Sequence, residues 1–287
     1  LPLLVDRDTL RATAQAWQER SSGPLAIEAE HLSVASLRAL EAAGCTLVET
    51  RDVVEECRVV KDAGEMALIA QACSISDRAL AALLPTLRLG DTERSIARRL
   101  EAAMFDLGAD AISFDTIVAV GPNSAIPHHQ PTERPLASGD FLLIDFGAAV
   151  GGYHADETRT FVWGEPAAWQ RDLHALVLAA QESARVAATA GASLRDVDAA
   201  ARDVIAAAGF GDAFNHGLGH GVGVQIHESP FMSARATGML LAGSPVTIEP
   251  GVYLADRGGV RIEDTVTVTE GPCIPLTTSD RSLVVLG

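Results

Sequence analysis

The sequence predicts an α+β protein in which a small α/β domain precedes a larger domain built from two related halves. Two patterns support this fold class: strands and a helix alternate near the N-terminus, and a helix-start pattern at Gly90 recurs at Gly191. We expect residues 1–56 to form the small domain and residues 57–287 the large one, because 287 residues are enough for both.

The N-terminal segment has a strand–helix–strand pattern. Residues 24–27 and 46–48 read as short apolar strands, and residues 33–43 read as a helix that ends before Gly44. Residues 3–6 resemble the end of a strand, and the chain opens with leucine instead of methionine. We therefore expect this α/β domain to be incomplete.

The large domain repeats one helix-start pattern. Residues 90–96, Gly-Asp-Thr-Glu-Arg-Ser-Ile, predict a capped helix that ends at Gly108. Residues 191–197, Gly-Ala-Ser-Leu-Arg-Asp-Val, predict a second such helix that ends at Gly209. Each follows another long helical pattern and precedes strand-like segments. Two halves of this kind place the expected site between them.

Composition narrows the possible functions. The chain has 22 Lys and Arg against 38 Asp and Glu residues, and its net charge of −16 argues against a nucleic-acid partner. Its apolar runs fall far short of the roughly 20 residues of a membrane helix, so we expect no membrane span. The 4 cysteines form no CxxC pair, which is typical of reduced thiols in the cytoplasm.

Four segments of the large domain with an apolar strand pattern each contain one carboxylate of interest. Asp145 interrupts Phe-Leu-Leu-Ile-Asp-Phe, and Asp156 follows a glycine-bearing turn, so a hairpin can bring the two together. In the second half, Glu249 ends one apolar strand and Glu263 lies within another. A buried carboxylate left alone is costly or loses its charge, so these residues need a cation or strong donors.

Residues 216–228 read His-Gly-Leu-Gly-His-Gly-Val-Gly-Val-Gln-Ile-His-Glu, and the glycines predict a backbone that comes close to a bound group. Four carboxylates and one imidazole suit a pair of Mn²⁺, Co²⁺, Zn²⁺ or Fe²⁺ ions. The zinc motif HExxH and the dinucleotide-binding fingerprint are both absent. Taken singly, each aspartate could instead be salt-bridged, with Arg159 or Arg261 as its partner.

Taken together, the motifs resemble those of the pita-bread metallopeptidases, which include methionine aminopeptidase, aminopeptidase P and prolidase. The matching stretches are Ile126-Pro-His-His, Gly139 to Gly147, Gly152 to Thr160, Gly219 to Pro230, Ile248-Glu-Pro-Gly-Val-Tyr and Val260-Arg-Ile-Glu-Asp-Thr. The resemblance implies the pita-bread fold with pseudo-twofold duplicated halves. The segment from Cys57 to Met66 resembles the junction after the small N-terminal domain in the proline-specific branch.

The resemblance also implies two divalent metal ions per chain, of Mn, Co or Zn. The implied ligands are Asp145, Asp156, His220, Glu249 and Glu263. The implied substrate-binding residues are His128, His216, His227 and Arg261. Asp156 and Glu263 would bridge the ions, and Arg261 would orient Glu263. The implied catalytic residues are Glu249, as the acceptor of the proton from an attacking water, together with His128 and His227.

The implied reaction is hydrolysis of the Xaa-Pro bond in a di- or oligopeptide by a cytoplasmic homodimer. Many prolidases carry an arginine directly after His-Glu-x-Pro that pairs with the carboxylate of a dipeptide, whereas this chain has Phe231 there. We favour a Xaa-Pro dipeptidase over a Xaa-Pro aminopeptidase, with weaker discrimination against tripeptides than an arginine would give. The alternatives are a methionine-type aminopeptidase of the same fold and a non-catalytic homologue that binds peptides or partners.

Overall fold

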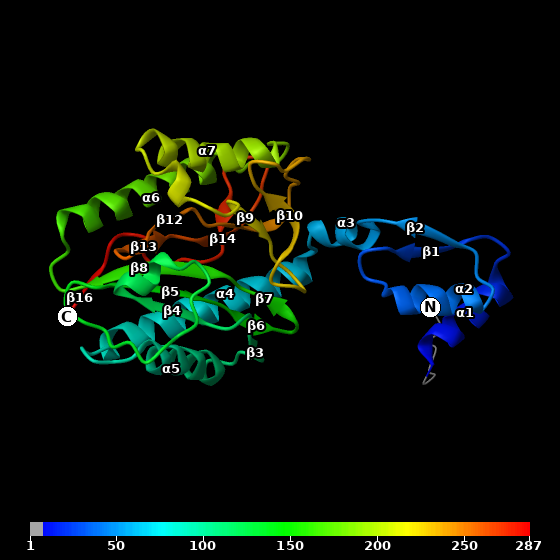
Figure 1. Cartoon of the computed structure of the whole chain (residues 1–287), viewed down its shortest axis with the longest axis horizontal. Coiled ribbons are helices and arrows are strands. Elements are labelled where there is room, and N and C mark those ends of the chain that lie inside the picture. The colour runs from blue at the N-terminus through cyan, green and yellow to red at the C-terminus, as the bar shows by residue number, and fades with distance from the viewer. Residues whose placement is uncertain (1–7) are drawn as a thin grey trace. The chain divides into compact units, whose positions relative to one another are not determined.

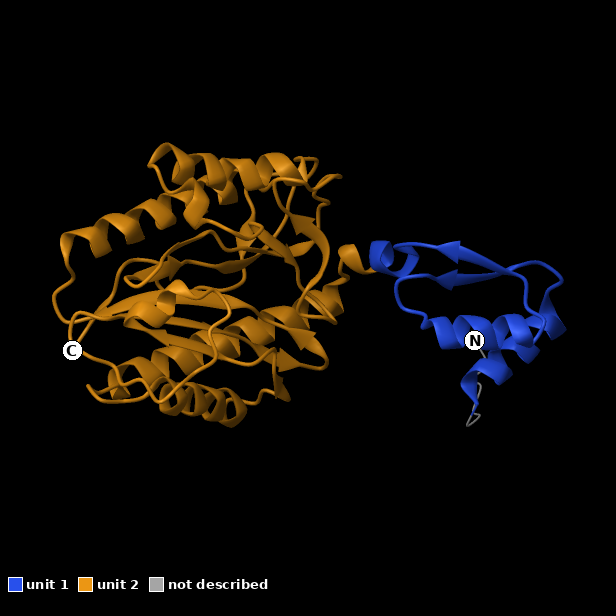
Figure 2. Cartoon of the chain, in the orientation of Figure 1, with its two compact units in different colours: residues 1–57 blue, residues 58–287 orange. Residues whose placement is uncertain are grey.

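The computed structural model describes residues 8–287, and the chain divides into two compact units, Leu1–Cys57 and Arg58–Gly287 (Figure 2). The boundary expected after residue 56 lies next to this division. The strand end expected at residues 3–6 lies outside the described residues.

The small unit joins helices to a parallel two-stranded sheet. Strands β1 (Leu25–Glu28) and β2 (Leu47–Thr50) pair in parallel, and α2 (Val34–Ala42) connects them. The sequence pattern predicts these three elements, but it misses α1 (Thr9–Arg20), in which polar residues obscure the apolar face. It also misses α3 (Val53–Val59), which spans the expected boundary between residues 56 and 57.

In the first half of the large unit, two helices pack against a four-stranded sheet. The helices are α4 (Ala63–Leu83), with a capping box, and α5 (Glu93–Asp106), capped by Thr92. The strand order is β16-β8-β5-β4. These strands are β4 (Ile117–Val120), β5 (Phe141–Phe146), β8 (Glu157–Trp163) and β16 (Val285–Leu286). The short strands β3 (Ala111–Ile112), β6 (Ala148–Val150) and β7 (Tyr153–His154) form a separate sheet.

In the second half, α6 (Ala168–Ala187) and α7 (Leu194–Ala207) share a second core with a five-stranded sheet ordered β10-β9-β11-β14-β15. Its strands are β9 (Gly219–Gly221), β10 (Glu228–Met232), β11 (Pro245–Ile248), β14 (Asp264–Thr267) and β15 (Ile274–Pro275). The hairpin of β12 (Gly251–Leu254) and β13 (Gly258–Arg261) completes this half. The α4–α5 and α6–α7 pairs lie on opposite sides of the strands (Figure 1).

The predicted duplication extends to individual backbone contacts. Thr92 forms a β-bridge with Pro135, and Ser193 forms the corresponding bridge with Met239. The N–H groups of Leu136 and Leu240 donate to the carbonyl groups of Asp91 and Ala192, both at 2.9 Å. These matching contacts support the predicted duplication of the two halves.

Among the described residues, one helical segment, Ala63–Thr86, is long and apolar enough to cross a membrane, judged by length and composition alone. The buried face of α4, which includes Ile69, Ala72 and Leu80, belongs to the core of the first half. Core helices of folded domains meet the same criterion, so this segment is weak evidence for a membrane span.

Candidate active site

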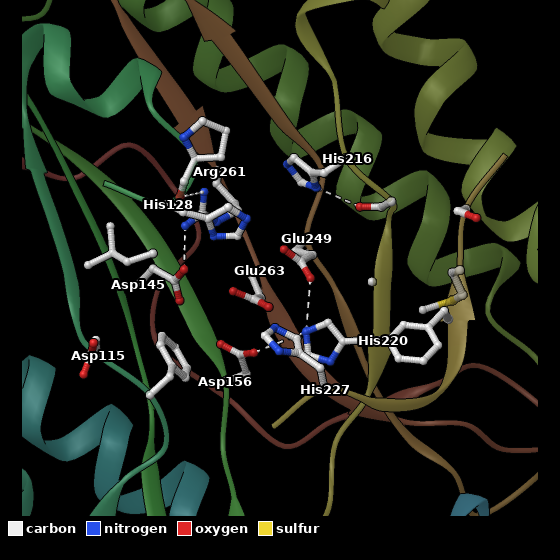
Figure 3. Close-up of a pocket in the computed structure, with 18 of the residues that line it drawn as sticks. Asp115, His128, Asp145, Asp156, His216, His220, His227, Glu249, Arg261 and Glu263 are labelled. Atoms are coloured by element: carbon white, nitrogen blue, oxygen red, sulfur yellow. Dashed lines mark hydrogen bonds and ion pairs between the residues drawn. The ribbon is translucent and has the colours of Figure 1, made fainter. Parts of the chain in front are cut away.

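A cavity of about 490 Å³, lined by residues of both halves, contains every side chain that the sequence analysis assigns to the site. These side chains are His128, Asp145, Asp156, His216, His220, His227, Glu249, Arg261 and Glu263 (Figure 3). The sequence therefore predicts which residues meet in one place. What each residue does in the reaction stays a prediction.

The carboxylates lie in or directly beside strands that end at the cavity. Asp145 is within β5, opposite Thr158 of β8. Asp156 lies between β7 and β8, and Glu263 lies between β13 and β14. We expected both residues within strands. Because strand pairing is interrupted at these two positions, their side chains do not follow the alternation of a continuous strand.

His220 reaches the site from the middle of β9. A Cβ atom added to Gly219 would lie 2.1 Å from the carbonyl oxygen of Thr247, and one added to Gly221 would lie 2.3 Å from that of Ser229. These glycines therefore allow β11 and β10 to approach β9. We expected these glycines to let the backbone approach a bound group, and that interpretation is wrong for Gly219 and Gly221.

The site groups oxygen and nitrogen donors closely enough for metal binding. His220 Nε2 lies 3.5 Å from Asp156 Oδ2 and 3.3 Å from Glu249 Oε1. Asp156, His220 and Glu263 each offer one ligand atom, and these atoms lie within 4.8 Å of one another. Asp145 Oδ1 is buried and has no hydrogen-bond partner. A buried carboxylate oxygen without a donor is costly, so this donor set fits divalent cations.

Burial and mutual repulsion set the charges of these groups. Burial, with neighbouring carboxylates, raises the pKa of Asp145 and Glu263 and raises that of Asp156 to about 7. Burial disfavours a charged His220, but its hydrogen bonds to Asp156 and Glu249 raise its pKa to about 10. Burial likewise opposes ionisation of Glu249, yet His220 lowers its pKa to about 2. Divalent cations would compete with protons for this site.

Arg261 forms hydrogen bonds with one carboxylate of the cluster and with two neighbouring side chains. Its Nη2 lies 2.5 Å from Asp145 Oδ2, its Nη1 donates to Tyr253 Oη at 2.8 Å, and its Nε donates to Thr158 Oγ1 at 3.0 Å. We expected Arg261 to lie behind Glu263 and orient it. Thr158 Oγ1 donates to Glu263 Oε2 at 2.6 Å, so Arg261 is linked to Glu263 through this hydroxyl group. The alternative that Asp145 is only salt-bridged to Arg261 therefore accounts for one of its two carboxylate oxygens.

Three further histidines surround the cluster. The ring centroids of His227 and His220 lie 4.4 Å apart, and His128 follows Pro127, whose carbonyl oxygen accepts a hydrogen bond from Arg261 (Figure 3). His216 Nε2 is 2.9 Å from Tyr253 Oη. Burial lowers the pKa of both His216 and His227, so both imidazoles are neutral near neutral pH and can donate or accept a hydrogen bond.

Several residues that build this site were not predicted from the sequence. Tyr253 links His216 to Arg261, and Thr158 links Arg261 to Glu263. Both residues belong to matching motifs, but neither interrupts the pattern of its strand. Apolar residues form another part of the cavity wall: Phe114, Ile117, Pro127, Phe231 and Met232.

Comparison with known proteins gives a consistent family assignment. The sequence matches the model of metallopeptidase family M24 over residues 67–270. It is 42% identical over 233 residues to the Xaa-Pro dipeptidase of Pyrococcus furiosus, covering 81% of this chain and 67% of that protein. The chain thus spans about two thirds of the length of the curated relatives it matches, with shares of 67% and 66% for two archaeal ones.

Solved structures agree with this assignment. A Xaa-Pro dipeptidase from Bacillus anthracis superimposes with a TM-score of 0.94 at 36% identity, covering 96% of this chain and 78% of that one. An X-Pro aminopeptidase from Thermotoga maritima gives a TM-score of 0.90 at 38% identity, covering 99% and 81%.

Proposed function

Since the chain belongs to metallopeptidase family M24 and is therefore a peptidase, we propose that it hydrolyses Xaa-Pro bonds with two divalent metal ions. The names of relatives that are 42% and 40% identical support the Xaa-Pro specificity. The observation that carries the metal assignment is Asp145 Oδ1, a buried carboxylate oxygen without a partner in a cavity that also holds Asp156, His220, Glu249 and Glu263.

The ligands divide between the two halves. Asp156 from the first half and Glu263 from the second would bridge the ions, Asp145 would complete one ligand set, and His220 with Glu249 would complete the other. Mn, Co and Zn suit such oxygen and imidazole donors. When bound, divalent ions would supply a Lewis acid for the scissile carbonyl group and an activated water.

The remaining side chains would orient substrate and move protons. Glu249 would accept a proton from the attacking water and pass it towards the leaving nitrogen. His227 would donate a hydrogen bond to the developing oxyanion, and His128 would contact the substrate beside it. Arg261 would hold Asp145, and His216, hydrogen-bonded to Tyr253, would contact the peptide from the second half.

The substrate proposal is a Xaa-Pro dipeptide, with longer peptides also accepted. The proline nitrogen of the scissile bond carries no N–H, so the pocket needs no hydrogen-bond acceptor for it. The apolar wall that includes Phe114, Ile117 and Phe231 can pack against the ring. The homodimer and the cytoplasmic location stay predictions, which analytical ultracentrifugation and cell fractionation test.

The test is a substrate panel on protein loaded with Mn²⁺. We expect cleavage of Xaa-Pro dipeptides and Xaa-Pro-Yaa tripeptides, loss of activity with a chelator, and recovery on adding metal back. Cleavage of Met-Ala-Yaa peptides in place of Xaa-Pro peptides would favour a methionine-type aminopeptidase. Peptide binding without turnover under any metal would favour the non-catalytic alternative.

A further inference from the structure

A buried carboxylate outside the cavity organises the loop that carries His128. Glu93 is the first residue of α5, and its side chain is 0% exposed. The loop, residues 121–132, follows β4 and contains only a short 3₁₀ helix, Gly121–Ala125. With little regular structure of its own, this loop depends on side chains of other elements for a fixed position.

Glu93 accepts hydrogen bonds from both ends of this loop. Its Oε1 accepts from the backbone N–H of Val120 and from Asn123 Nδ2, both at 2.8 Å. Its Oε2 lies 2.8 Å from His129 Nε2 and accepts from Thr132 N at 2.9 Å and from Thr132 Oγ1 at 2.6 Å. One side chain thus ties the start of the loop to its end.

The two neighbouring histidines of the loop are in opposite environments. His129 is 8% exposed and contacts Glu93, whereas His128 is exposed and lines the cavity. On the cavity side, Arg261 Nη1 donates to the carbonyl oxygen of Pro127 at 3.3 Å. The peptide segment around His128 is therefore held between Glu93 and Arg261.

Glu93 is well suited to this task because it stays charged. Burial opposes its ionisation, but the hydrogen bonds from Thr132, His129, Asn123 and Val120 outweigh burial and lower its pKa. Hydrogen bonds to an ionised acceptor are stronger than those between neutral groups. A neutral amide at this position would turn its NH2 group towards the backbone N–H of either Thr132 or Val120, because both oxygens of Glu93 accept such groups.

We propose that Glu93 is a positioning residue that fixes His128 for its contact with the substrate. This inference rests on the proposed Xaa-Pro peptidase function, since it gives His128 a substrate to contact. Glu93 itself touches neither the cavity nor the proposed metal ligands, so its effect on turnover is transmitted through the loop.

The test is a double-mutant cycle on metal-loaded protein. We expect Glu93→Gln to lower kcat/KM for a Xaa-Pro peptide by roughly 10- to 100-fold, the scale expected of a misplaced group, with bound metal unchanged. In a His128→Ala background the same substitution should cost less than about twofold, because the residue being positioned is gone. An undiminished loss in that background, or a loss of metal, would overturn the proposal.

Thr92→Ala is the matched control for simple destabilisation. It removes the N-cap hydrogen bond from Ser95 N to Thr92 Oγ1 in the same helix, while leaving the Glu93 carboxylate in place. We expect it to lower the unfolding temperature and leave kcat/KM within about twofold of wild type. If Glu93→Gln yields little folded protein, Thr132→Ala removes one donor and should give a smaller loss in the same direction. A loss with Thr92→Ala that equals the loss with Glu93→Gln would contradict the proposal.

Hydrogen exchange separates this inference from the proposed function. In Glu93→Gln we expect faster exchange for residues 121–132 and unchanged exchange for β5. If the wild type cleaves no Xaa-Pro peptide but the loop still loosens, the proposed function fails and the loop-holding role of Glu93 stands. If exchange of the loop does not change, the role of Glu93 is wrong whatever the enzyme cleaves.

Discussion

The two halves of the large unit begin α5 and α7 at corresponding residues, but the side chains there make different contacts. Thr92 and Ser193 stand at the corresponding N-cap positions; the Thr92 side chain accepts a hydrogen bond from Ser95 N, whereas the Ser193 side chain makes no capping hydrogen bond. The residue after Thr92 is Glu93, a buried carboxylate that holds the His128 loop, whereas the residue after Ser193 is Leu194, which is 5% exposed and packs in the second core.

The second half fixes its own histidine segment from a different helical position. Asp198 Oδ1 accepts from the backbone N–H of Leu218 at 3.1 Å and pairs with Arg202, which donates to the carbonyl oxygen of His216 at 2.8 Å. The residue corresponding to Asp198 in the first half is Ala97. The repeated backbone thus sets where these loops begin, while each half secures its loop with a carboxylate of its own.

The largest expected effect tests whether both halves are needed for metal binding. We predict that Asp156→Ala in the first half and Glu263→Ala in the second each reduce bound metal to near zero and abolish activity, because each would contact both ions. Asp145→Ala should retain more metal. Elemental analysis after dialysis measures this, and two ions per chain retained in Asp156→Ala would contradict the assignment.

The next effect compares the substrate-side histidines of the two halves. We predict that His128→Ala and His227→Ala each lower kcat/KM by on the order of 10²–10⁴, the range for proton-handling or oxyanion-stabilising groups, with metal content intact. Steady-state kinetics and metal analysis on the same samples check this. Loss of metal in His227→Ala would make that residue a ligand.

A smaller effect concerns Phe231, which faces the cavity from β10 of the second half. Phe231 pairs with His220 in the sheet, is 53% exposed and lines the cavity. We predict that Phe231→Arg favours Xaa-Pro over Xaa-Pro-Yaa in kcat/KM by about 1.5–3 kcal/mol, because a guanidinium can bind the dipeptide carboxylate. Phe231→Gln is the uncharged control.

The effect of Phe231→Arg is measured against the wild-type preference between Xaa-Pro and Xaa-Pro-Yaa. If the wild type already refuses every tripeptide while cleaving dipeptides efficiently, another residue binds the carboxylate. Phe231 would then have no part in selecting substrate length.

The smallest expected effect is a pH dependence of the unfolding free energy that comes from Glu93 in the first half. Because the pKa of Glu93 is lowered in the folded state, its ionised form contributes stability above its unfolded pKa, and this contribution is lost as the pH falls through the folded value. We predict that the difference in unfolding free energy between wild type and Glu93→Gln shrinks as the pH falls below about 4.3, the ordinary pKa of glutamate. Urea denaturation measures it, and a constant difference would show that the charge is not what matters.

Residues of the candidate site could be predicted where a charged residue interrupts the apolar pattern of a strand. Asp145 stands inside an otherwise apolar strand and demands a partner, which makes it visible in the sequence. Glu93 has no such signal, because an acidic residue in the first turn of a helix is favourable even when fully exposed. Only the fold shows that this side chain is buried against a loop that follows it in the chain.

The fold could be predicted where local chemistry decides it. Caps and terminal glycines locate α5 and α7, and the repeat predicts that the two halves are alike. Strand order and register arise from pairing between distant segments, so the breaks beside Asp156 and Glu263 have no local signature. The same applies to Thr158, whose β-branched side chain reads as an ordinary strand residue.

The hydrogen bonds that join the halves at the site have a consequence for the order of synthesis. Thr158 and Glu263 are separated by 105 residues, and Arg261 and Asp145 by 116. A ribosome-bound chain that has exposed only the first half holds α4, α5, β4, β5 and β8, yet it lacks β16 and the partners of Thr158 and Asp145. The proposed ligand set therefore closes only after Glu263 has left the ribosome, so metal capture by the full set must follow the emergence of both halves.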